Sequence, residues 1–483
     1  MFYDKIIFEV STPGQVGHDF YTETNNLSKL PNNLKRATRI DLPEVSEPTV
    51  VRHYTNLSNK NFGVDTGFYP LGSCTMKYNP KINEEMATLS PFLSSHPLSP
   101  VSANQGSLEL MYETDLLLRE ITGMDYFSLA PFAGAHGELL GLWIIKAYHQ
   151  SRKDNKRTKI IIPDSAHGTN PASAAVAGFE ILEVKSNADG TVNVDDLKTL
   201  LSDEIAGIML TNPNTLGIFE KDILQISKLI HGCGGLLYYD GANLNALLGQ
   251  GKPAHMGFDI VHLNVHKTLS TPHGGGGPGA GPVGVVKELF DYLPSPIVRK
   301  KGNKYELFNP KKSVGRIGHF YGNFQVIVKT NAYIKTLGAK YLSQVGGLAV
   351  LNANYIRKSL EADYLVAIDD ICMHEVVFDG LVDKSTSVKT LDVAKRLLDY
   401  GVHPPTIYFP LIVSEAMMVE PTETESLDTL NHFIRVMKKI SEEAKENPEL
   451  LKEAPHHTLV RRLDEVSAAR NPIVKFDDIK KED

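Results

Sequence analysis

The chain has 483 residues, of which 42% are hydrophobic and 22% charged, and this ordinary balance excludes collagen-like and disordered proteins. Its formal net charge of −7 gives no electrostatic reason to expect nucleic acid or an anionic membrane surface as a partner. The three cysteines lack CxxC spacing, and no apolar run reaches the roughly 18 residues of a membrane span. These features predict a soluble cytoplasmic protein without a disulfide framework.

Residues 1–104 show weak periodicity and recurrent Pro, Asn and Ser, which predicts an extended segment rather than a compact domain. A long segment of this kind has to lie across the body of its own chain or across another subunit. The alternative is a loosely packed arm without a function. We refer to residues 1–104 as the N-terminal segment.

Residues 105–344 alternate between helical and strand patterns and are expected to form the large domain. Helical spacing of apolar residues predicts helices at 108–122, 137–149, 195–201 and 221–231. Short apolar runs predict strands at 159–162, 181–184, 205–210, 236–239, 260–265 and 283–286. Such strands separated by helices are typical of an α/β fold with a mainly parallel sheet covered on both faces.

Residues 345–483 are expected to form a smaller α+β C-terminal domain. The pattern predicts a strand at 374–379 and a helix at 388–400 that ends at Gly401. A long charged helix is predicted at 425–447, introduced by Thr422 and Glu425 in the spacing of a capping box.

Polar residues directly after the predicted strands are candidate functional residues, because ligands of parallel sheets lie beyond the carboxyl ends of the strands. These residues are His167, Thr211, Asp240, Asn243, His266 and Lys267. Each also has a structural explanation, since an Asp after a strand is often a helix cap and a His is often only hydrogen-bonded. Their common position after successive strands is what favours a shared site.

Together these residues match the needs of pyridoxal phosphate. The Lys267 amine could form a Schiff base, a use to which desolvated lysines are suited. The Asp240 carboxylate could keep the pyridine nitrogen protonated, so that the ring accepts electrons. His167 could stack on the ring, and Asn243 could hold its 3′ oxygen.

The phosphate needs exposed N–H groups, which the start of a helix offers. The small-residue turn at 134–137 precedes a predicted helix, and its candidate phosphate-binding residues are Gly134, Ala135 and His136. Thr211 is a further candidate for cofactor binding. The glycines of 273–282 allow close approach of the backbone to a ligand or a partner.

Competing motifs are weaker. Gly274, Gly276 and Gly279 match GxGxxG, but two prolines and the lack of a following helix spoil a dinucleotide-binding turn. No GK[ST] sequence is present, which excludes a P-loop. His262 and His266 lack a carboxylate or Cys partner at suitable spacing, so no metal is expected.

Several long motifs resemble glycine dehydrogenase (decarboxylating), the P-protein of the glycine cleavage system. They are GFYPLGSCTMKYNPKINE (67–84), APFAGAHGEL (130–139), DSAHGTNPAS (164–173), TNPNTLGIFE (211–220), YDGANLNALLG (239–249), DIVHLNVHKTLSTPHGGGGPGAGP (259–282) and VEPTETES (419–426). The resemblance runs from about residue 45 almost to the end, where LDEVSAARNP also fits. It is to the subunit 2 form, which corresponds to the C-terminal half of the single-chain enzyme and carries the cofactor lysine, here Lys267.

The resemblance implies a fold-type-I pyridoxal phosphate enzyme that decarboxylates glycine and passes the aminomethyl group to the lipoyl arm of H-protein. It also implies a heterotetramer with subunit 1, two copies of each, in which the N-terminal segment embraces the neighbouring subunit. Lys267 and His167 would be catalytic, and His266 would help to place the phosphate or the ring.

Two alternatives remain. Another fold-type-I enzyme, such as a relative of cysteine desulfurase, would need a mobile cysteine beyond the lysine, and the candidate Cys372 lies in a stretch with the pattern of a core. A scaffold subunit without catalysis would have no use for both Lys267 and Asp240.

Overall fold

The structure is a computed structural model that describes residues 5–17, 31–38, 41–272 and 277–479. The chain forms two compact units. One combines the described residues up to Thr66 with those from Arg462 onward, and the other spans Gly67–Arg461.

The first unit is built from short helices. Phe8 stacks on Phe476 with ring centroids 4.8 Å apart, and so links the beginning of the described chain to its end. The longest helix of this unit exposes Val51 and Tyr54, which are 57% and 56% accessible. Its helices are η1 (Ile7–Val10), η3 (Asn32–Leu34), α1 (Glu47–Ser58), α13 (Glu465–Arg470) and α14 (Phe476–Ile479).

A seven-stranded sheet, in the order β1-β7-β6-β5-β4-β2-β3, forms the centre of the second unit. Strands β2 to β6 run parallel, and β7 is antiparallel to both of its neighbours. The strands are β1 (Tyr126–Ser128), β2 (Lys159–Pro163), β3 (Glu180–Val184), β4 (Ile205–Leu210), β5 (Leu236–Gly241), β6 (Ile260–Leu263) and β7 (Val283–Val285). Every residue of β4 and β5 is buried, as a doubly covered sheet requires. The predicted mainly parallel sheet is confirmed.

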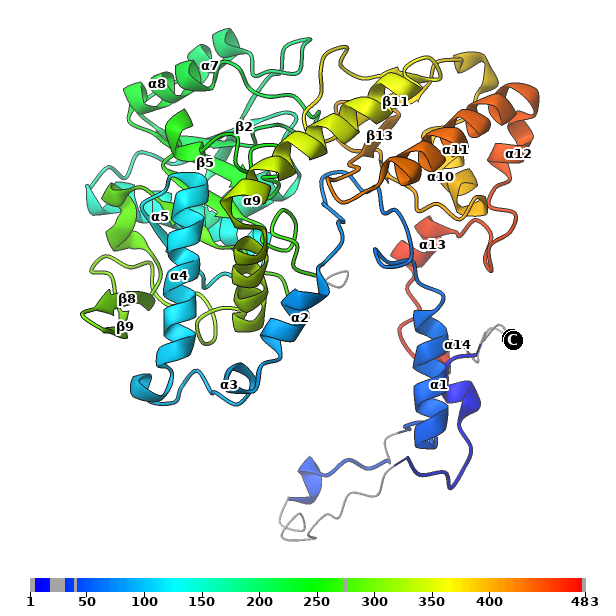
Figure 1. Cartoon of the computed structure of the whole chain (residues 1–483), viewed down its shortest axis with the longest axis horizontal. Coiled ribbons are helices and arrows are strands. Elements are labelled where there is room, and N and C mark those ends of the chain that lie inside the picture. Colours follow the sequence, from blue (N-terminus) through cyan, green and yellow to red (C-terminus); the bar gives the residue numbers. More distant parts are fainter. Residues whose placement is uncertain (1–4, 18–30, 39–40, 273–276, 480–483) are drawn as a thin grey trace. The chain divides into compact units, whose positions relative to one another are not determined.

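Helices cover both faces of this sheet (Figure 1). Ile160 and Tyr238 pack on the face covered by α5 and α6. Ile161 and Tyr239, their neighbours along the strands, pack on the face covered by α4, α7, α8 and the start of α9. The helices are α4 (Gln105–Thr122), α5 (Gly134–Ser151), α6 (Thr169–Ala177), α7 (Val194–Leu200), α8 (Ile223–Cys233) and α9 (Phe324–Leu360).

Helix α9 was not predicted, and it serves two hydrophobic cores. Its backbone leaves helical geometry at Gly338, where φ is 62°, so two helices meet at a kink. The first half packs on the seven-stranded sheet, whereas Ala353 and Ile356 of the second half belong to the core of the smaller sheet.

The smaller sheet has four antiparallel strands in the order β10-β11-β13-β12. Phe378 of this sheet and Phe433 of the helix that covers it are fully buried. The elements are β10 (Tyr364–Val366), β11 (Val376–Leu381), α10 (Thr390–Asp399), β12 (Thr406–Ile407), β13 (Ala416–Val419), α11 (Leu427–Glu446) and α12 (Pro448–Lys452). The predicted smaller α+β part is therefore present.

The predicted capping box of the long helix is wrong. Helix α11 begins at Leu427, and its N-cap is Ser426, whose hydroxyl accepts a hydrogen bond from the Thr429 backbone at 3.2 Å. The Thr422 hydroxyl instead forms a hydrogen bond with Thr424, so the chain before the helix is held in its own turn.

Residues 67–80, which we call the strap, lie beside β13. Leu71 pairs with Val419 in an isolated β-bridge, and the Thr406 hydroxyl donates to Gly72 O at 2.8 Å. The strap leads into α2 (Lys81–Ala87) and α3 (Ser90–Leu93).

Strands β8 (Ile297–Lys301) and β9 (Lys304–Phe308) form a separate two-stranded hairpin. Short 3-10 helices are η4 (Val101–Ala103), η5 (Pro253–Met256), η6 (Lys287–Tyr292) and η7 (Lys384–Thr386). None of the helices in the described ranges has both the length and the apolar character needed to cross a membrane.

Candidate active site

A cavity of about 170 Å³ lies at the carboxyl ends of the parallel strands. Its lining residues come from the strap (Ser73), the start of α5 (Gly134, Ala135, Glu138), the segments after the strands (His167, Thr169, Thr211, Pro213, Asn214, Thr215, Asp240, Ala242, Asn243, Asn264, Lys267) and the segment before β11 (His374, Glu375). This is the edge at which parallel sheets bind ligands.

Lys267 lies in the turn that follows β6 and lines the cavity. Its Nζ donates a hydrogen bond to the backbone oxygen of Ser73 at 2.5 Å. The amine is therefore held by a backbone carbonyl of the strap. A ligand that reacts with the amine would have to displace this hydrogen bond.

Asp240 is nearly the last residue of β5 and is 3% exposed. Its Oδ1 accepts a hydrogen bond from the backbone of Ala242 at 3.0 Å and lies 3.5 Å from His262 Nε2. Burial lowers the pKa of His262, whose Nδ1 forms a 2.5 Å hydrogen bond with the Tyr238 hydroxyl. The neutral imidazole thus lies beside the carboxylate, but its Nε2 makes no hydrogen bond in the structure.

His167 belongs to a chain of hydrogen bonds that reaches into α5. Its Nδ1 lies 2.8 Å from the Thr169 hydroxyl, which donates to Glu138 Oε1 at 2.9 Å. The Ser173 hydroxyl donates to the other oxygen of Glu138. Burial, and then the nearby Asp240, raise the pKa of Glu138 to about 7, and burial lowers that of His167.

Helix α5 begins at the cavity with Gly134 and Ala135, and no side chain caps it. The N–H groups of the first helical turn have no partners within the helix. A Cβ on Gly134 would overlap the side chain of Asn264, so the close approach at this point requires glycine. Thr211 Oγ1 and Asn264 Oδ1 are buried in the cavity wall without a hydrogen-bond partner.

Asn243 binds to a buried acid that the sequence analysis did not assign. Its Nδ2 donates to both oxygens of Glu420 at 3.0 Å, and Glu420 also accepts from the Thr75 hydroxyl and from Asn245. The carboxyl of Glu420 is completely buried, and three donors satisfy it. The amide that was predicted to hold the ring's 3′ oxygen is engaged in this network.

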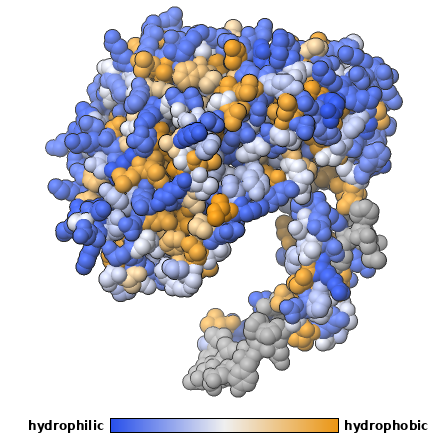
Figure 2. Space-filling view, viewed as in Figure 1, coloured by the Kyte–Doolittle hydropathy of each residue, from blue (hydrophilic) through white to orange (hydrophobic). Residues whose placement is uncertain are grey.

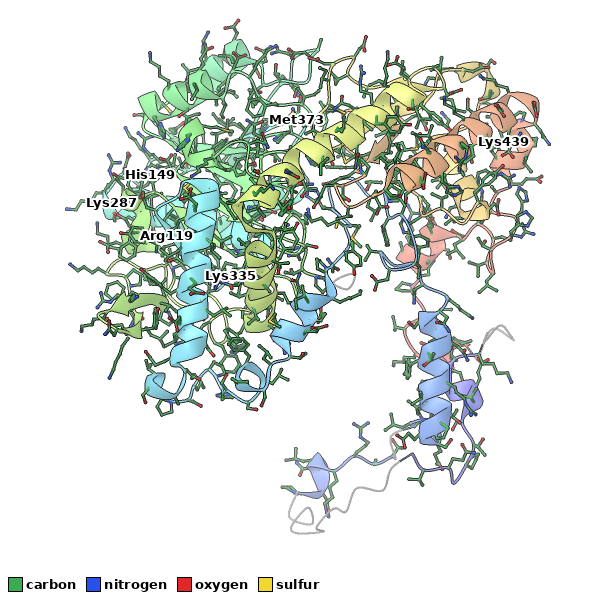
Figure 3. All side chains as sticks on the ribbon, in the orientation of Figure 1. Arg119, His149, Lys287, Lys335, Met373 and Lys439 are labelled. Atoms are coloured by element: carbon green, nitrogen blue, oxygen red, sulfur yellow. The ribbon has the colours of Figure 1, made fainter. Side chains whose placement is uncertain are left out.

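The segment before β11 forms the wall of the cavity that faces the strap. Met373, labelled in Figure 3, donates its backbone N–H to Gly217 O at 2.7 Å, which fixes this segment beside the loop after β4. Glu375 accepts a hydrogen bond from the Ser73 backbone at 2.8 Å. His374 is 2% exposed, and neither of its ring nitrogens has a hydrogen-bond partner.

The structure brings most of the predicted site residues into this one cavity. They are Lys267, His167, Asp240, Asn243, Gly134, Ala135 and Thr211. His136 and His266 do not line it. His136 Nδ1 accepts from the Phe132 backbone at 3.2 Å, and His266 Nδ1 accepts from the Ala280 backbone at 3.3 Å.

Residues 273–276 of the glycine-rich stretch, including Gly274 and Gly276 of the literal GxGxxG, lie outside the described residues.

Sequence reasoning missed several residues of the site. Glu138, Ser73 and Glu420 lie within the motifs that carried the family resemblance, so a motif signal was present although no role followed from it. His374 and Glu375 lie in none of these motifs. Only the packing of the smaller sheet against the strap places them at the cavity.

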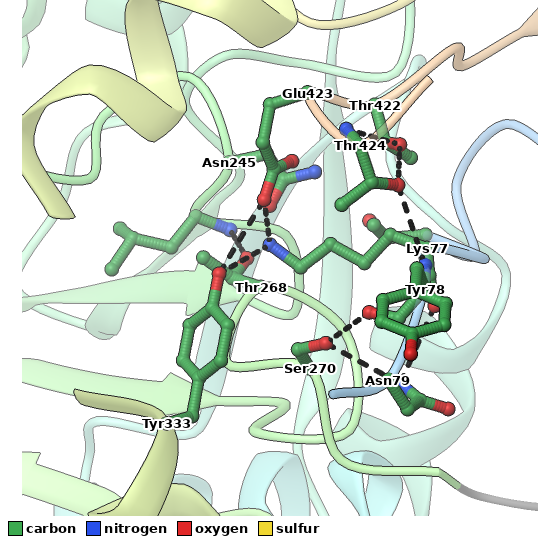
Figure 4. A network of polar contacts seen from close by, with 12 residues as sticks. Lys77, Tyr78, Asn79, Asn245, Thr268, Ser270, Tyr333, Thr422, Glu423 and Thr424 are labelled. Atoms are coloured by element: carbon green, nitrogen blue, oxygen red, sulfur yellow. Dashed lines mark hydrogen bonds and ion pairs between the residues drawn. The ribbon is translucent and has the colours of Figure 1, made fainter. Parts of the chain in front are cut away.

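A second buried polar network anchors the strap beyond the cavity (Figure 4). Lys77 Nζ forms an ion pair with Glu423 at 2.6 Å and donates to the Tyr333 hydroxyl at 3.2 Å. The side chain of Lys77 is fully buried, and burial alone would lower its pKa, but Glu423 raises it. The strap is thereby tied both to the segment after β13 and to α9.

Comparison with family models gives two matches. The model described as "Glycine cleavage system P-protein" matches residues 19–304, and the model "Glycine dehydrogenase, C-terminal domain" matches residues 345–460.

Curated relatives cover nearly the whole chain. A protein of Caldanaerobacter subterraneus subsp. tengcongensis named "Probable glycine dehydrogenase (decarboxylating) subunit 2" is 60% identical over 98% of this chain and 99% of its own length. A protein of the same name from Thermotoga maritima is 56% identical over 97% of this chain and 99% of its own length.

Solved structures share the fold at low sequence identity. A glycine decarboxylase (P-protein) of the glycine cleavage system, in inhibitor-bound form, has a TM-score of 0.72 at 20% identity and covers 86% of this chain and 94% of its own. Glutamate decarboxylase of Lactobacillus brevis has a TM-score of 0.65 at 13% identity, covering 85% and 96%. A cysteine desulfurase of Thermococcus onnurineus scores 0.59 at 14% identity, covering 78% and 97%.

Proposed function

The chain belongs to the glycine cleavage system P-protein family, in its subunit 2 form, and on that premise we propose that it decarboxylates glycine with the help of pyridoxal phosphate. The enzyme is a glycine dehydrogenase (decarboxylating), an oxidoreductase, with the fold of the fold-type-I enzymes. We further propose that the aminomethyl group passes to the lipoyl arm of a carrier, the H-protein.

The observation that carries this proposal is the meeting of Lys267 and Asp240 in one cavity at the start of α5. The fit to pyridoxal phosphate is supported by an amine, a buried carboxylate and an uncapped helix start that suits a phosphate. The unpartnered Thr211 Oγ1 and Asn264 Oδ1 are further groups that a bound ligand could satisfy.

Each side chain has a definite task in this proposal. Lys267 would attach the cofactor, and His167 would pack on its ring. Asp240 would hold a proton on the ring nitrogen, and Asn243, whose amide Glu420 orients, would lie near the 3′ oxygen. Pyridoxal phosphate, when bound, supplies the electron sink for the bond pair that departing CO2 leaves behind.

The phosphate is proposed to bind the N–H groups of Gly134 and Ala135, with Thr211 beside them. His136 and His266 would act from outside the cavity. His266 holds the backbone of Ala280, and His136 holds that of Phe132, so both support the walls of the phosphate site.

The cysteine desulfurase alternative is not favoured. Its candidate nucleophile, Cys372, is 3% exposed, and burial raises the pKa of its thiol to about 12. A thiol in that environment is inert, because the thiolate is the reactive form. The family assignment also favours glycine dehydrogenase over cysteine desulfurase.

The subunit 2 form implies a subunit 1 partner. We propose a heterotetramer with two copies of each chain, in which the N-terminal segment packs on the neighbouring subunit. The exposed Val51 and Tyr54 of α1 support this arrangement, since apolar surface of this kind suits an interface. Apolar patches also interrupt the polar surface in Figure 2. A cytoplasmic location is proposed because Cys74, Cys233 and Cys372, all within the described residues, form no disulfide.

The test compares Lys267→Ala with Lys439→Ala, an exposed lysine on α11, in the assembled enzyme. Wild type and the Lys439 variant should show the absorbance of bound cofactor and exchange labelled CO2 with the glycine carboxyl when lipoylated H-protein is added. The Lys267 variant should lose both signals. Unchanged signals in that variant would remove the lysine from its assigned role.

A second variant tests the electron sink. Asp240→Ala should keep part of the bound cofactor but lose nearly all CO2 exchange, because the ring nitrogen no longer stays protonated. Retained exchange in this variant contradicts the role of Asp240.

A further inference from the structure

His374 has no task in the function proposed so far, although it faces the cavity. The side chain is 2% exposed, and both Nδ1 and Nε2 lack a hydrogen-bond partner. Buried polar groups of folded proteins are nearly always hydrogen-bonded, because leaving one unpaired is unfavourable. A ligand of the cavity that accepts a hydrogen bond would supply the partner that the protein does not.

The wall around His374 carries less negative charge than its composition indicates. A ring nitrogen of His374 and one carboxylate oxygen each of Glu375 and Glu420 lie within 4.8 Å of one another. Burial raises the pKa of both carboxyls, to about 8 for Glu375 and about 7 for Glu420, and the nearby Glu420 raises that of Glu375 further, so Glu375 keeps its proton at neutral pH. Burial lowers the pKa of His374 to about 3, with help from Lys267, so its ring is neutral and presents one N–H.

Arginine is the usual side chain for a carboxylate, because its planar head donates two parallel hydrogen bonds. Within the described ranges of the chain, no arginine lines the cavity. Resting on the proposed function, we propose that the N–H of His374 binds the carboxylate of glycine, with the uncharged carboxyl of Glu375 beside it.

A neutral donor suits a carboxylate that has to leave. When the C–C bond breaks, its electron pair stays with the aminomethyl carbon, and the carboxylate departs as uncharged CO2. A strong ion pair to an arginine would stabilise the charged ground state more than the transition state and would slow this step. The hydrogen bond from His374 would hold the carboxylate in place and would stabilise the charged ground state less than an ion pair with arginine does.

The experiment measures binding to the assembled holoenzyme with two ligands, glycine and methylamine, through the change in cofactor absorbance. Methylamine is glycine without its carboxylate, so it reports on everything except the contact in question. In His374→Leu the Kd for glycine should rise about tenfold or more, the range for a hydrogen bond to a charged group. The Kd for methylamine should stay unchanged.

Two further variants serve as controls. His374→Gln keeps an N–H donor and should bind glycine more tightly than His374→Leu does. His432→Ala, an exposed histidine on α11, should match wild type with both ligands. In the CO2 exchange assay, His374→Leu should raise the KM for glycine by a larger factor than it lowers kcat.

The outcomes separate the two proposals. If His374→Leu weakened the binding of glycine and methylamine equally, or weakened neither, the role of His374 would be overturned. The proposed decarboxylase function would be unaffected. A wild-type enzyme that binds methylamine but neither binds glycine nor exchanges CO2 would refute the proposed function, and this inference with it.

Discussion

Glu138 links the titration of the cavity to the stability of the fold. Burial and the neighbouring Asp240 raise its pKa from 4.5 to about 7. A carboxyl whose pKa is higher in the folded state binds its proton more tightly there than in the unfolded chain. The stability that this proton contributes is complete below about pH 4.5 and is lost as the pH rises through about 7.

Glu138→Gln should therefore change how stability depends on pH. The amide cannot ionise, so between about pH 4.5 and 7 wild type should lose stability relative to the variant. Thermal unfolding of both proteins across this range measures the difference. Glu120→Gln is the control, because Lys252 lowers the pKa of this exposed acid and its effect has the opposite sign. Parallel curves for wild type and Glu138→Gln would contradict the assignment.

The buried ion pair of Lys77 and Glu423 should be a sensitive point of the strap. Lys77→Met leaves the Glu423 carboxylate buried without its cation, which costs about 3–5 kcal/mol in comparable buried pairs. The midpoint of urea unfolding should fall accordingly. Adding Glu423→Leu to this variant removes the second charge and should recover part of the loss. An unchanged midpoint in the single variant would show that the pair is not buried in solution.

Sequence reasoning found the site residues that follow strands, and it did so for a geometric reason. Asp240 and Lys267 are far apart in sequence, but parallel strands bring their carboxyl ends to one edge. His374 and Glu375 precede a strand of the smaller sheet. The sequence pattern does not predict which edge of the seven-stranded sheet the smaller sheet lies against. Glu138 was missed for another reason, because it lies one turn inside a helix whose start alone was considered.

At the scale of the secondary-structure elements, α5 approaches β5 closely behind the site. Gly141 of α5 faces Tyr238 of β5, and a Cβ there would overlap the tyrosine ring. The ring cannot simply turn away, because its hydroxyl is hydrogen-bonded to Nδ1 of His262, whose other ring nitrogen lies 3.5 Å from Asp240. The absence of a side chain at Gly141 is therefore needed for the packing of α5 against Tyr238.

Gly141→Ala should destabilise the protein by about 1–3 kcal/mol, the usual cost of overpacking a core. Gly347→Ala is the matched control, since this helical glycine of α9 is exposed and has open space around it. It should stabilise by about 0.5–1 kcal/mol, because alanine favours the helix. Unfolding midpoints of the two variants should therefore move in opposite directions. A shift of both in the same direction contradicts the packing argument.

The buried strands were predictable, whereas α9 and the start of α11 were not. Strand β4 is apolar along its whole length and β5 over its first four residues, so a short run of residues reveals them. Helix α9 packs one half against each core and bends at Gly338. Its apolar residues therefore do not form one continuous stripe at helical spacing. Thr422 has the spacing of a capping box, but its φ of 60° is incompatible with an N-cap, which has an extended backbone.

The division of the chain into two units makes a prediction about truncation. Within the described residues, the clusters of buried apolar side chains lie between Phe68 and Leu451, as do the residues that line the cavity. A fragment of residues 67–461 should therefore unfold at nearly the same urea concentration as the full chain. It should fail to join subunit 1 in size-exclusion chromatography, because it lacks most of the N-terminal segment. A fragment that unfolds much earlier, or that still assembles, would contradict one half of this expectation.

The cavity wall is gathered from places distant in the sequence, from Ser73 in the strap to Glu375 before β11, with Glu420 behind it. A nascent chain leaves the ribosome from its N-terminus, so Ser73 emerges long before its partner Glu375. Until then the lysine turn and the helix start face water on one side. We therefore expect the proposed coenzyme to bind only at the end of synthesis, when the last wall has been translated.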